Sequence, residues 1–210
     1  MRVVFEDDAL IVVDKPAGLL TMGTESEREK TAYAISRAYL NSKRPPEKTF
    51  IVHRLDREAS GLLVFAKTIP AKEHLQNQFK DHSAGRTYIA VADGAVQPNQ
   101  FVIRSLLAEN SAYRVYSTKD RRLGKDSVTH VRVLKRGAKS SLLEIRLETG
   151  RKHQIRVHLA ERGNPIAGDK IYGNGGGRFG RLALHGARLE FKHPRTGKKM
   201  AFDSPCPPNW

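Results

Sequence analysis

The chain has 210 residues, which is enough for one domain with a sizeable hydrophobic core. Lysine and arginine number 37 against 22 acidic residues, and the resulting formal net charge of +15 favours a polyanion, nucleic acid above all, as the partner. The longest apolar runs, Ala9–Val13 and Leu62–Ala66, are far shorter than the roughly 20 residues of a membrane-spanning helix.

The N-terminus predicts a β-hairpin. Residues 3–5 and 9–14 have the apolar and β-branched content of two short strands, with Glu6-Asp7-Asp8 as the turn between them. These acidic residues stand where a secretory signal would be apolar, so we expect a cytoplasmic protein. No helix combines a basic face with an aromatic and leucine face, which disfavours a membrane surface as the partner.

A helix is predicted after this hairpin. It would end at Pro45-Pro46, because proline removes a hydrogen-bond donor and restricts the residue before it. The apolar residues at helical spacing are Ala32, Ile35 and Tyr39.

The segment 49–68, TFIVHRLDREASGLLVFAKT, places a polar stretch between two predicted strands, 50–52 and 62–66. Within this stretch Asp56 lies between Arg54 and Arg57, and nearby guanidinium groups favour the ionised carboxylate. Such a group is a better nucleophile or base than acid. An acidic residue paired for purely structural reasons would have the same sequence, and Gly61 would allow a tight turn into the second strand.

The middle of the chain predicts a helix followed by a sheet. Thr68 is placed to cap a helix with Pro70 in its first turn and Gly85 at its end. The alternation in 86–92 predicts a strand with Tyr88 on the face opposite Ile89, although a half-buried strand tyrosine is ordinary sheet packing. Further strands are predicted at 101–107, 113–117, 127–134 and 141–148, which gives a largely antiparallel or mixed sheet and an α+β fold. The last of these strands has Leu143, Ile145 and Leu147 in strict alternation.

The segment 150–158, GRKHQIRVH, reads as a helix start with several donors. Backbone N–H groups and basic side chains at such a position favour an anion, and a solvated basic face would have the same sequence. The helix should end near Gly163, and the glycine-rich segment 173–180 should be a loop. Closing strands are predicted at 181–192 and 198–203.

The sequence also argues against a metal site, a nucleotide-binding loop and a nucleophilic cysteine. His153 and His158 are five residues apart and lie off a common helical face, so we expect no metal. The glycine run follows no clear strand and opens no helix, which excludes a dinucleotide fingerprint and a P-loop. Cys206 lies in a proline-rich tail without a base beside it. We see no internal repeat and no long linker, and we expect a single domain over residues 1–210.

Several ordered segments together resemble the RluA-type pseudouridine synthases, which isomerise uridine in RNA. The resemblance runs from about Val4 to Pro205. Its segments are VVDKPAGLL, HRLDREASGLLVFAKT, GRTYIAV, ETGRKHQIRVHLAERGNPIAGDKIYG and LALHGARLEFKHP.

This resemblance implies a pseudouridine synthase fold, with a mixed, mostly antiparallel, bent central sheet flanked by helices and loops. It implies that Asp56 is the catalytic aspartate, that Tyr88 stacks against the target uracil, and that Arg156 pairs with the aspartate. Arg54 would enter the RNA stack to help evict the uridine, and Ile155 would form an apolar wall. The remaining candidates for binding RNA are His53, Arg151, Lys152, Lys170 and Arg178.

The isomerisation is neither a redox reaction nor a group transfer between molecules, so we expect no cofactor. We expect a monomer that acts on ribosomal RNA, transfer RNA or both. Two departures from the family pattern stand out: Ala59 replaces a common threonine, and we expect no N-terminal S4-type RNA-binding domain, because the catalytic fold begins within the first few residues. Two other hypotheses remain open, a non-catalytic RNA-binding or ribosome-assembly protein with the same fold and a nucleoside or nucleic-acid hydrolase.

Overall fold

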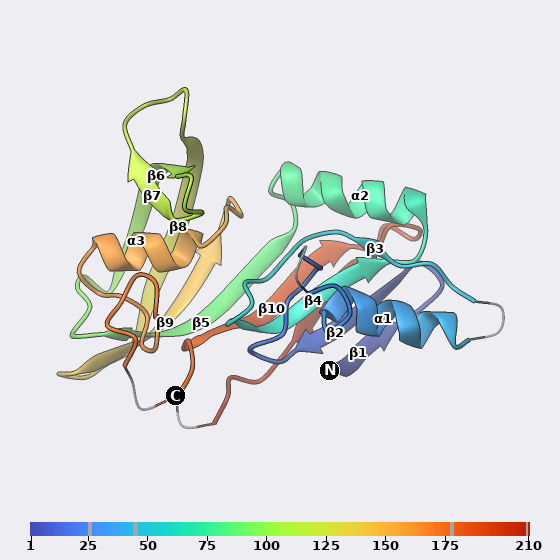
Figure 1. Cartoon of the computed structure of the whole chain (residues 1–210), viewed down its shortest axis with the longest axis horizontal. Helices are drawn as coiled ribbons and strands as arrows, with labels where there is room; N and C mark the ends of the chain where they lie inside the picture. The colour runs from blue at the N-terminus through green and yellow to red at the C-terminus, as the bar shows by residue number, and fades with distance from the viewer. Residues whose placement is uncertain (25–26, 44–45, 177–178, 209) are drawn as a thin grey trace. The chain divides into compact units, whose positions relative to one another are not determined.

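The computed structural model describes residues 1–24, 27–43, 46–176, 179–208 and 210. The chain divides into two compact units (Figure 1). The first unit contains residues 1–86 and 186–205, and the second contains residues 87–185 and 206–210. The single domain expected from the sequence stays a prediction. The expected α+β class is confirmed, because the described chain combines three helices with a mostly antiparallel sheet.

The first unit has strands in the order β1-β2-β4-β10, with β3 paired to β4 and β11 paired to β10. The predicted hairpin is confirmed, and the Asp7 carboxylate closes its turn by accepting from the N–H groups of Ala9 and Leu10. Of the strand predicted at 50–52, only two residues pair. The bounds are β1 Arg2–Glu6, β2 Leu10–Lys15, β3 Phe50–Ile51, β4 Ser60–Ala66, β10 Leu184–Lys192 and β11 Lys199–Asp203.

Two helices belong to this unit, α1 (Ala32–Asn41) and α2 (Ile69–Lys80). The Thr68 hydroxyl accepts from Ala71 N at 3.2 Å, so the predicted cap is confirmed. Helix α2 ends at Lys80, earlier than predicted, and Gly85 instead begins the next strand. For α1, Pro45 lies outside the described residues.

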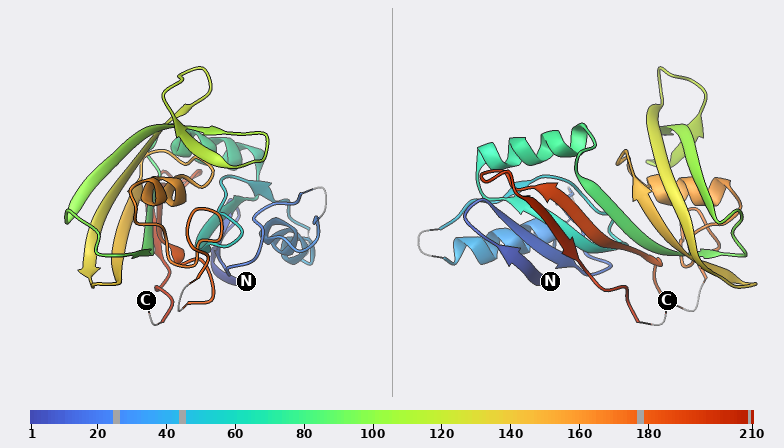
Figure 2. Two further views of the ribbon diagram at one scale, coloured as in Figure 1. Left: turned by 60° about the vertical axis from the view of Figure 1, so that its left-hand side comes forward. Right: turned by 180° about the vertical axis from the view of Figure 1, so that it is seen from behind.

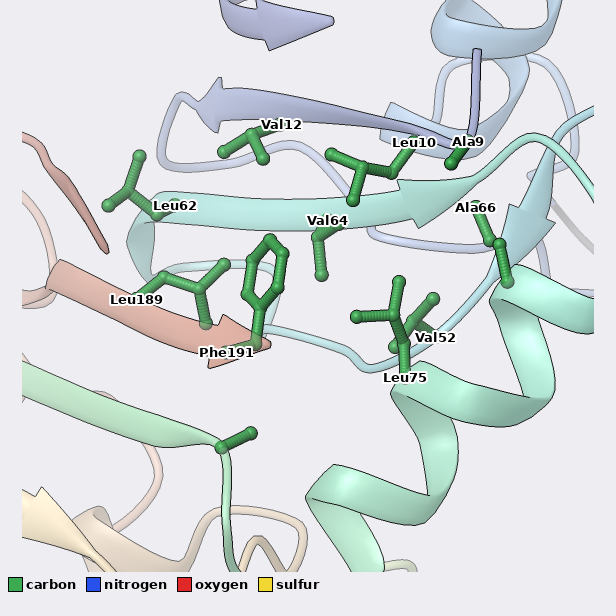
Figure 3. Packing of buried hydrophobic residues seen from close by; sticks show 12 residues of the cluster. Ala9, Leu10, Val12, Val52, Leu62, Val64, Ala66, Leu75, Leu189 and Phe191 are labelled. Carbon is green, nitrogen blue, oxygen red and sulfur yellow. The ribbon is translucent and has the colours of Figure 1, made fainter. Parts of the chain in front are cut away.

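The core of the first unit is packed between α2 and its sheet (Figure 3). Leu75 of α2 points toward Val64 of β4 and Phe191 of β10. The alternation along β4 places Leu62, Val64 and Ala66 on this side of the sheet, because successive strand residues point to opposite faces. The segment that carries Asp56 therefore leaves a packed core at Val52 and returns to it at Leu62.

The second unit is a five-stranded antiparallel sheet in the order β5-β9-β8-β6-β7. Helix α3 (Gln154–Glu161) lies against one face of this sheet, over β7 and β8 (Figure 2). The predicted alternation in β9 is confirmed, since Leu143 and Ile145 are both fully buried. The strand bounds are β5 Gly85–Asp93, β6 Gln100–Glu109, β7 Val115–Thr118, β8 Lys125–Arg136 and β9 Ser140–Leu147.

A buried polar network joins α3 to the sheet. The His158 ring contacts Ser105 Oγ through Nε2 and Thr129 Oγ1 through Nδ1, each at 2.9 Å. Burial lowers the pKa of His158 to about 4, so the ring is neutral at pH 7. Both ring nitrogens thus have hydrogen-bonding partners, as a buried polar side chain requires.

Candidate active site

Asp56 lies in the loop between β3 and β4 of the first unit. Its side chain is half-buried, and its neighbours alternate in burial. Val52 and Leu55 are 8% and 5% exposed, whereas Arg54 and Arg57 are exposed. The apolar residues anchor the loop in the core, and the arginines remain accessible to an anionic ligand.

A buried lysine holds this loop to the end of β2. Lys15 is 1% exposed, and its Nζ donates to the carbonyls of Leu19 and Ala59 at 2.7 Å. It also lies 3.1 Å from Pro16 O and 3.3 Å from Arg57 O. A buried ammonium is stabilised only when such acceptors replace its water, so Lys15 links the two segments strongly. The carbonyl of Ala59 is one acceptor, so the departure from threonine at this position leaves the link intact.

The residues on both sides of Asp56 are fixed through their backbone. Thr21 Oγ1 donates to Leu55 O at 2.8 Å and accepts from Leu55 N at 3.0 Å. Gly18 N donates to Arg57 O at 2.8 Å, and Arg57 Nε donates to Gly18 O at 3.1 Å. The segment VDKPAGLLT therefore serves as the support of the Asp56 loop, a role that the sequence analysis missed. The available signal was a lysine at the end of the strand Leu10–Lys15, whose first four residues are apolar.

Gly61 follows the loop at a position where a side chain has no room. Its φ is +120°, and an added Cβ would lie 2.3 Å from Gly186 O of β10. The glycine thus permits close approach of two strands. A turn is predicted here from the sequence, but Gly61 lies within β4, and the steric constraint comes from a segment that is distant in the sequence.

His53 is held in the packing of the first unit. Its ring stacks on Phe79 with centroids 4.5 Å apart, and its Nε2 accepts from Val64 N at 3.2 Å. Burial, with a smaller contribution from the Arg86 charge, lowers the pKa of His53 to about 3. The ring is therefore neutral and held by packing, and the expected contact of His53 with RNA stays a prediction.

Tyr88 is in the second unit, on β5. It is 7% exposed and pairs in register with the buried Ile145 of β9. Ile89 points to the other face, as the alternation predicted. Its proposed contact with uracil stays a prediction.

Arg156 lies on α3 of the second unit, is 1% exposed and has a carboxylate partner that the sequence analysis missed. Its Nε donates to Asp169 Oδ2 at 2.8 Å and its Nη2 to Asp169 Oδ1 at 2.9 Å. The backbone N–H groups of Ile171 and Tyr172 also donate to Asp169 Oδ1. Burial alone would raise the pKa of Asp169, but the guanidinium and these donors outweigh it and hold the pKa below its usual value.

The basic segment before α3 differs from the predicted helix start. The helix begins only at Gln154, because His153 takes a left-handed conformation with φ of 53°. The Gln154 side chain accepts from Arg151 N at 3.0 Å and donates to Val128 O at 3.0 Å. Lys152 pairs with Glu109. Lys152 is thus positioned by an acidic partner within the second unit, and its expected contact with RNA stays a prediction.

The remaining candidates are placed as follows. Arg151 and Lys170 are exposed, and Ile155 is 4% exposed on α3. Arg178 lies outside the described residues. Within the described part of the chain, no group of three or more histidine, cysteine and acidic residues is arranged to hold a metal ion. None of the helices described is long and apolar enough to cross a membrane.

The sequence of residues 9–161 matches the RNA pseudouridylate synthase family, and the chain belongs to this family. It is 40% identical to the ribosomal large subunit pseudouridine synthase D of Neisseria meningitidis serogroup A, over 99% of this chain and 58% of that protein. It is 36% identical to the uncharacterized RNA pseudouridine synthase YhcT of Bacillus subtilis, over 99% of this chain and 69% of that protein. The chain thus spans about 60–70% of the length of these two relatives.

Solved structures support the fold. Human RNA pseudouridylate synthase domain containing 4 superposes with a TM-score of 0.81 at 23% identity, covering 99% of this chain and 89% of that chain. Human RNA pseudouridylate synthase domain containing 1 superposes with a TM-score of 0.76 at 26% identity, covering 97% and 82%. These structures confirm the expected pseudouridine synthase fold, and the match of residues 9–161 to the family confirms the resemblance inferred from the sequence segments.

Proposed function

We propose that this chain isomerises uridine to pseudouridine in RNA, with Asp56 as the catalytic group. The observation that carries the proposal is the placement of Asp56 in a chain of this family. Its carboxylate is half-buried, and the residues before and after it are hydrogen-bonded to the segment 18–21. A reacting group gains from such fixed geometry, because less freedom is lost in reaching the transition state.

The proposed reaction breaks the ribose C1′–N1 bond, turns the uracil and forms the C1′–C5 bond. The C5 proton leaves and N1 gains a proton, so atoms and electrons balance without an oxidant or a cofactor. Asp56 either adds to C1′ as a nucleophile or removes the 2′ proton as a base. Tyr88 would hold the uracil ring, and Arg156 would favour the ionised Asp56.

Exposed Arg54 fits the task of entering the RNA stack. A uridine within a stem must be flipped out of the helix, at a cost of a few kcal/mol. A guanidinium on the same loop as Asp56 can fill the vacated space by stacking, and its charge attracts the neighbouring phosphates. The further candidates for contacts with the RNA remain His53, Ile155, Arg151, Lys152 and Lys170.

The proposed substrate is ribosomal RNA of the large subunit. The support is that relatives at 39–40% identity carry the name ribosomal large subunit pseudouridine synthase D. The formal charge of +15 suits a large folded RNA, whose binding releases condensed counterions.

The test replaces Asp56 with asparagine. Asp56→Asn should abolish pseudouridine formation in ribosomal RNA and leave RNA affinity nearly unchanged, because the side chain keeps its size. Glu58→Gln, which neutralises another carboxylate of the same loop, should retain activity. Pseudouridines are mapped chemically, and binding is measured in parallel.

Other outcomes separate the competing hypotheses. Pseudouridine formation by Asp56→Asn at the wild-type rate would refute the assignment. Salt-dependent binding without any pseudouridine from the wild-type chain would favour the non-catalytic RNA-binding protein. Free uracil or cleaved RNA as the product would favour the hydrolase. Pseudouridine in transfer RNA alone would correct the proposed substrate.

A further inference from the structure

The turn between β6 and β7 of the second unit presents an aromatic ring to solvent. Tyr113 is 75% exposed, the largest value among the exposed large hydrophobic residues of the described chain. Single exposed apolar residues are common on protein surfaces, so exposure alone implies nothing. The surroundings of this tyrosine distinguish it.

The backbone of Tyr113 is held in a conformation that suits glycine. Its φ is 59°, in the left-handed region, which a bulky residue rarely adopts. The turn is nevertheless closed by three hydrogen bonds: Tyr113 N to Asn110 O at 2.9 Å, Arg114 N to Asn110 Oδ1 at 2.9 Å and Asn110 N to Arg114 O at 3.0 Å. A strained position maintained by its surroundings is a reason to look for a function of the side chain.

A cation further fixes the ring. Lys152 Nζ lies 5.4 Å from the centroid of the Tyr113 ring and donates to Tyr113 O at 3.1 Å. Lys152 also pairs with Glu109, so this lysine is positioned from two sides. The ring is therefore exposed and at the same time oriented, which lowers the entropy lost when a flat ligand stacks on it.

The surroundings are basic. Arg114 and Arg151 are exposed, and the next turn, 119–124, carries further exposed cations. That turn lies at the other end of β7, and its Arg122 pairs with Asp120. The cations at the Tyr113 turn are Arg114, the next residue, and Lys152, against the acidic Glu109. We call Tyr113, Arg114 and Lys152 the Tyr113 patch. Its excess of positive charge suits a phosphate backbone.

We infer that the Tyr113 patch binds an unpaired segment of the RNA substrate, with one base stacked on the Tyr113 ring and the adjacent phosphates held by Lys152 and Arg114. Stacking on an aromatic ring is tolerant of base identity, and cations beside the ring track the backbone. Single-stranded RNA fits this arrangement better than a duplex, whose bases are already stacked. The inference rests on the proposed function and adds a second contact site for the substrate of the Asp56 loop.

The experiment measures binding of a fluorescent single-stranded oligouridine, about a dozen nucleotides long, to the full chain at several salt concentrations. Tyr113→Gly removes the ring and relieves the backbone conformation, so the variant should fold at least as stably as the wild type. We expect it to bind oligouridine about 5- to 100-fold more weakly, the effect of losing one stacked base. Tyr113→Phe should bind normally.

The matched control is Tyr39→Ala in the first unit. Tyr39 is 43% exposed, and Lys43 Nζ lies 5.1 Å from its ring centroid, so this variant removes another exposed tyrosine with a lysine over its ring. It should leave oligouridine affinity unchanged. Lys152→Ala should lower the slope of log affinity against log salt by about one phosphate contact.

Three results would overturn the inference: wild-type affinity for oligouridine in Tyr113→Gly, equal losses in Tyr113→Phe and Tyr113→Gly, or no measurable binding by the wild type at low salt. The assay does not depend on isomerisation. Loss of binding in Tyr113→Gly, together with an absence of pseudouridine from the wild type, would therefore refute the proposed function and leave the Tyr113 patch standing.

Discussion

Replacing Asp169 with asparagine should destabilise the protein by about 3–5 kcal/mol, the usual cost of removing one partner of a buried ion pair. The side chains of Arg156 and Asp169 are 1% and 0% exposed and share two hydrogen bonds. Asparagine keeps the size but replaces one acceptor oxygen with an NH2 group. That group would face either Arg156 Nε or the three donors that now converge on Asp169 Oδ1.

The assay is urea unfolding of the full chain. A loss of this size lowers the midpoint by about 1–5 M, given a slope near 1–3 kcal/mol per molar urea. The double variant Asp169→Asn with Arg156→Met should be more stable than Asp169→Asn alone, because it no longer buries the guanidinium. An exposed pair supplies the control: Asp203→Asn, opposite Arg188, should change little.

Two results would refute this reasoning. One is an Asp169→Asn midpoint that equals the wild-type value. The other is a double variant whose loss of stability equals the sum of the two single losses, because additivity would mean that the two side chains are not energetically coupled.

Three further variants test the buried Lys15, the close approach of β4 to β10 at Gly61, and the buried His158 of the second unit. Lys15→Met should lower kcat in pseudouridine formation more than RNA affinity, because the loop loses an ammonium bound to four carbonyls; equal losses of both would contradict this role. Gly61→Ala should prevent folding or strongly destabilise the first unit, as seen by circular dichroism, since the new Cβ would meet Gly186 O; a wild-type melting temperature would contradict this. For His158, the folded pKa is about 4 and the unfolded value 6.5, so stability falls as the pH drops through that window. His158→Gln should reduce this fall by roughly 3 kcal/mol, measured by urea unfolding at each pH, whereas an unchanged slope would exclude His158 as its source.

Elements set by local sequence were predicted well. The hairpin at the N-terminus, the Thr68 cap and the alternation in β9 each depend on residues within one turn or one strand of each other. The family resemblance located Asp56, Tyr88 and Arg156, and their catalytic roles stay predictions. Local periodicity alone described Tyr88 as an ordinary strand residue.

The supporting contacts were missed because their partners are distant in the sequence. Lys15 binds the carbonyl of Ala59, 44 residues later, and Arg156 binds Asp169, 13 residues later. The start of α3 was placed too early because His153 takes a left-handed conformation that composition does not reveal. A buried lysine or aspartate is chemically identical in sequence to an exposed one, so only the fold distinguishes them.

The hydrogen bonds on both sides of Asp56 determine which substitutions test the chemical role of its carboxylate and which test the position of its loop. Leu55 is hydrogen-bonded to Thr21, and Arg57 is hydrogen-bonded to Gly18. None of these hydrogen bonds involves the side chain of Asp56. Asp56→Asn should therefore leave the loop in place, and a loss of activity there reports on the carboxylate itself. Lys15→Met alters the loop while leaving that carboxylate unchanged. If Asp56 acts through its position as well as its charge, both variants must lose activity, and only Lys15→Met should also lose stability.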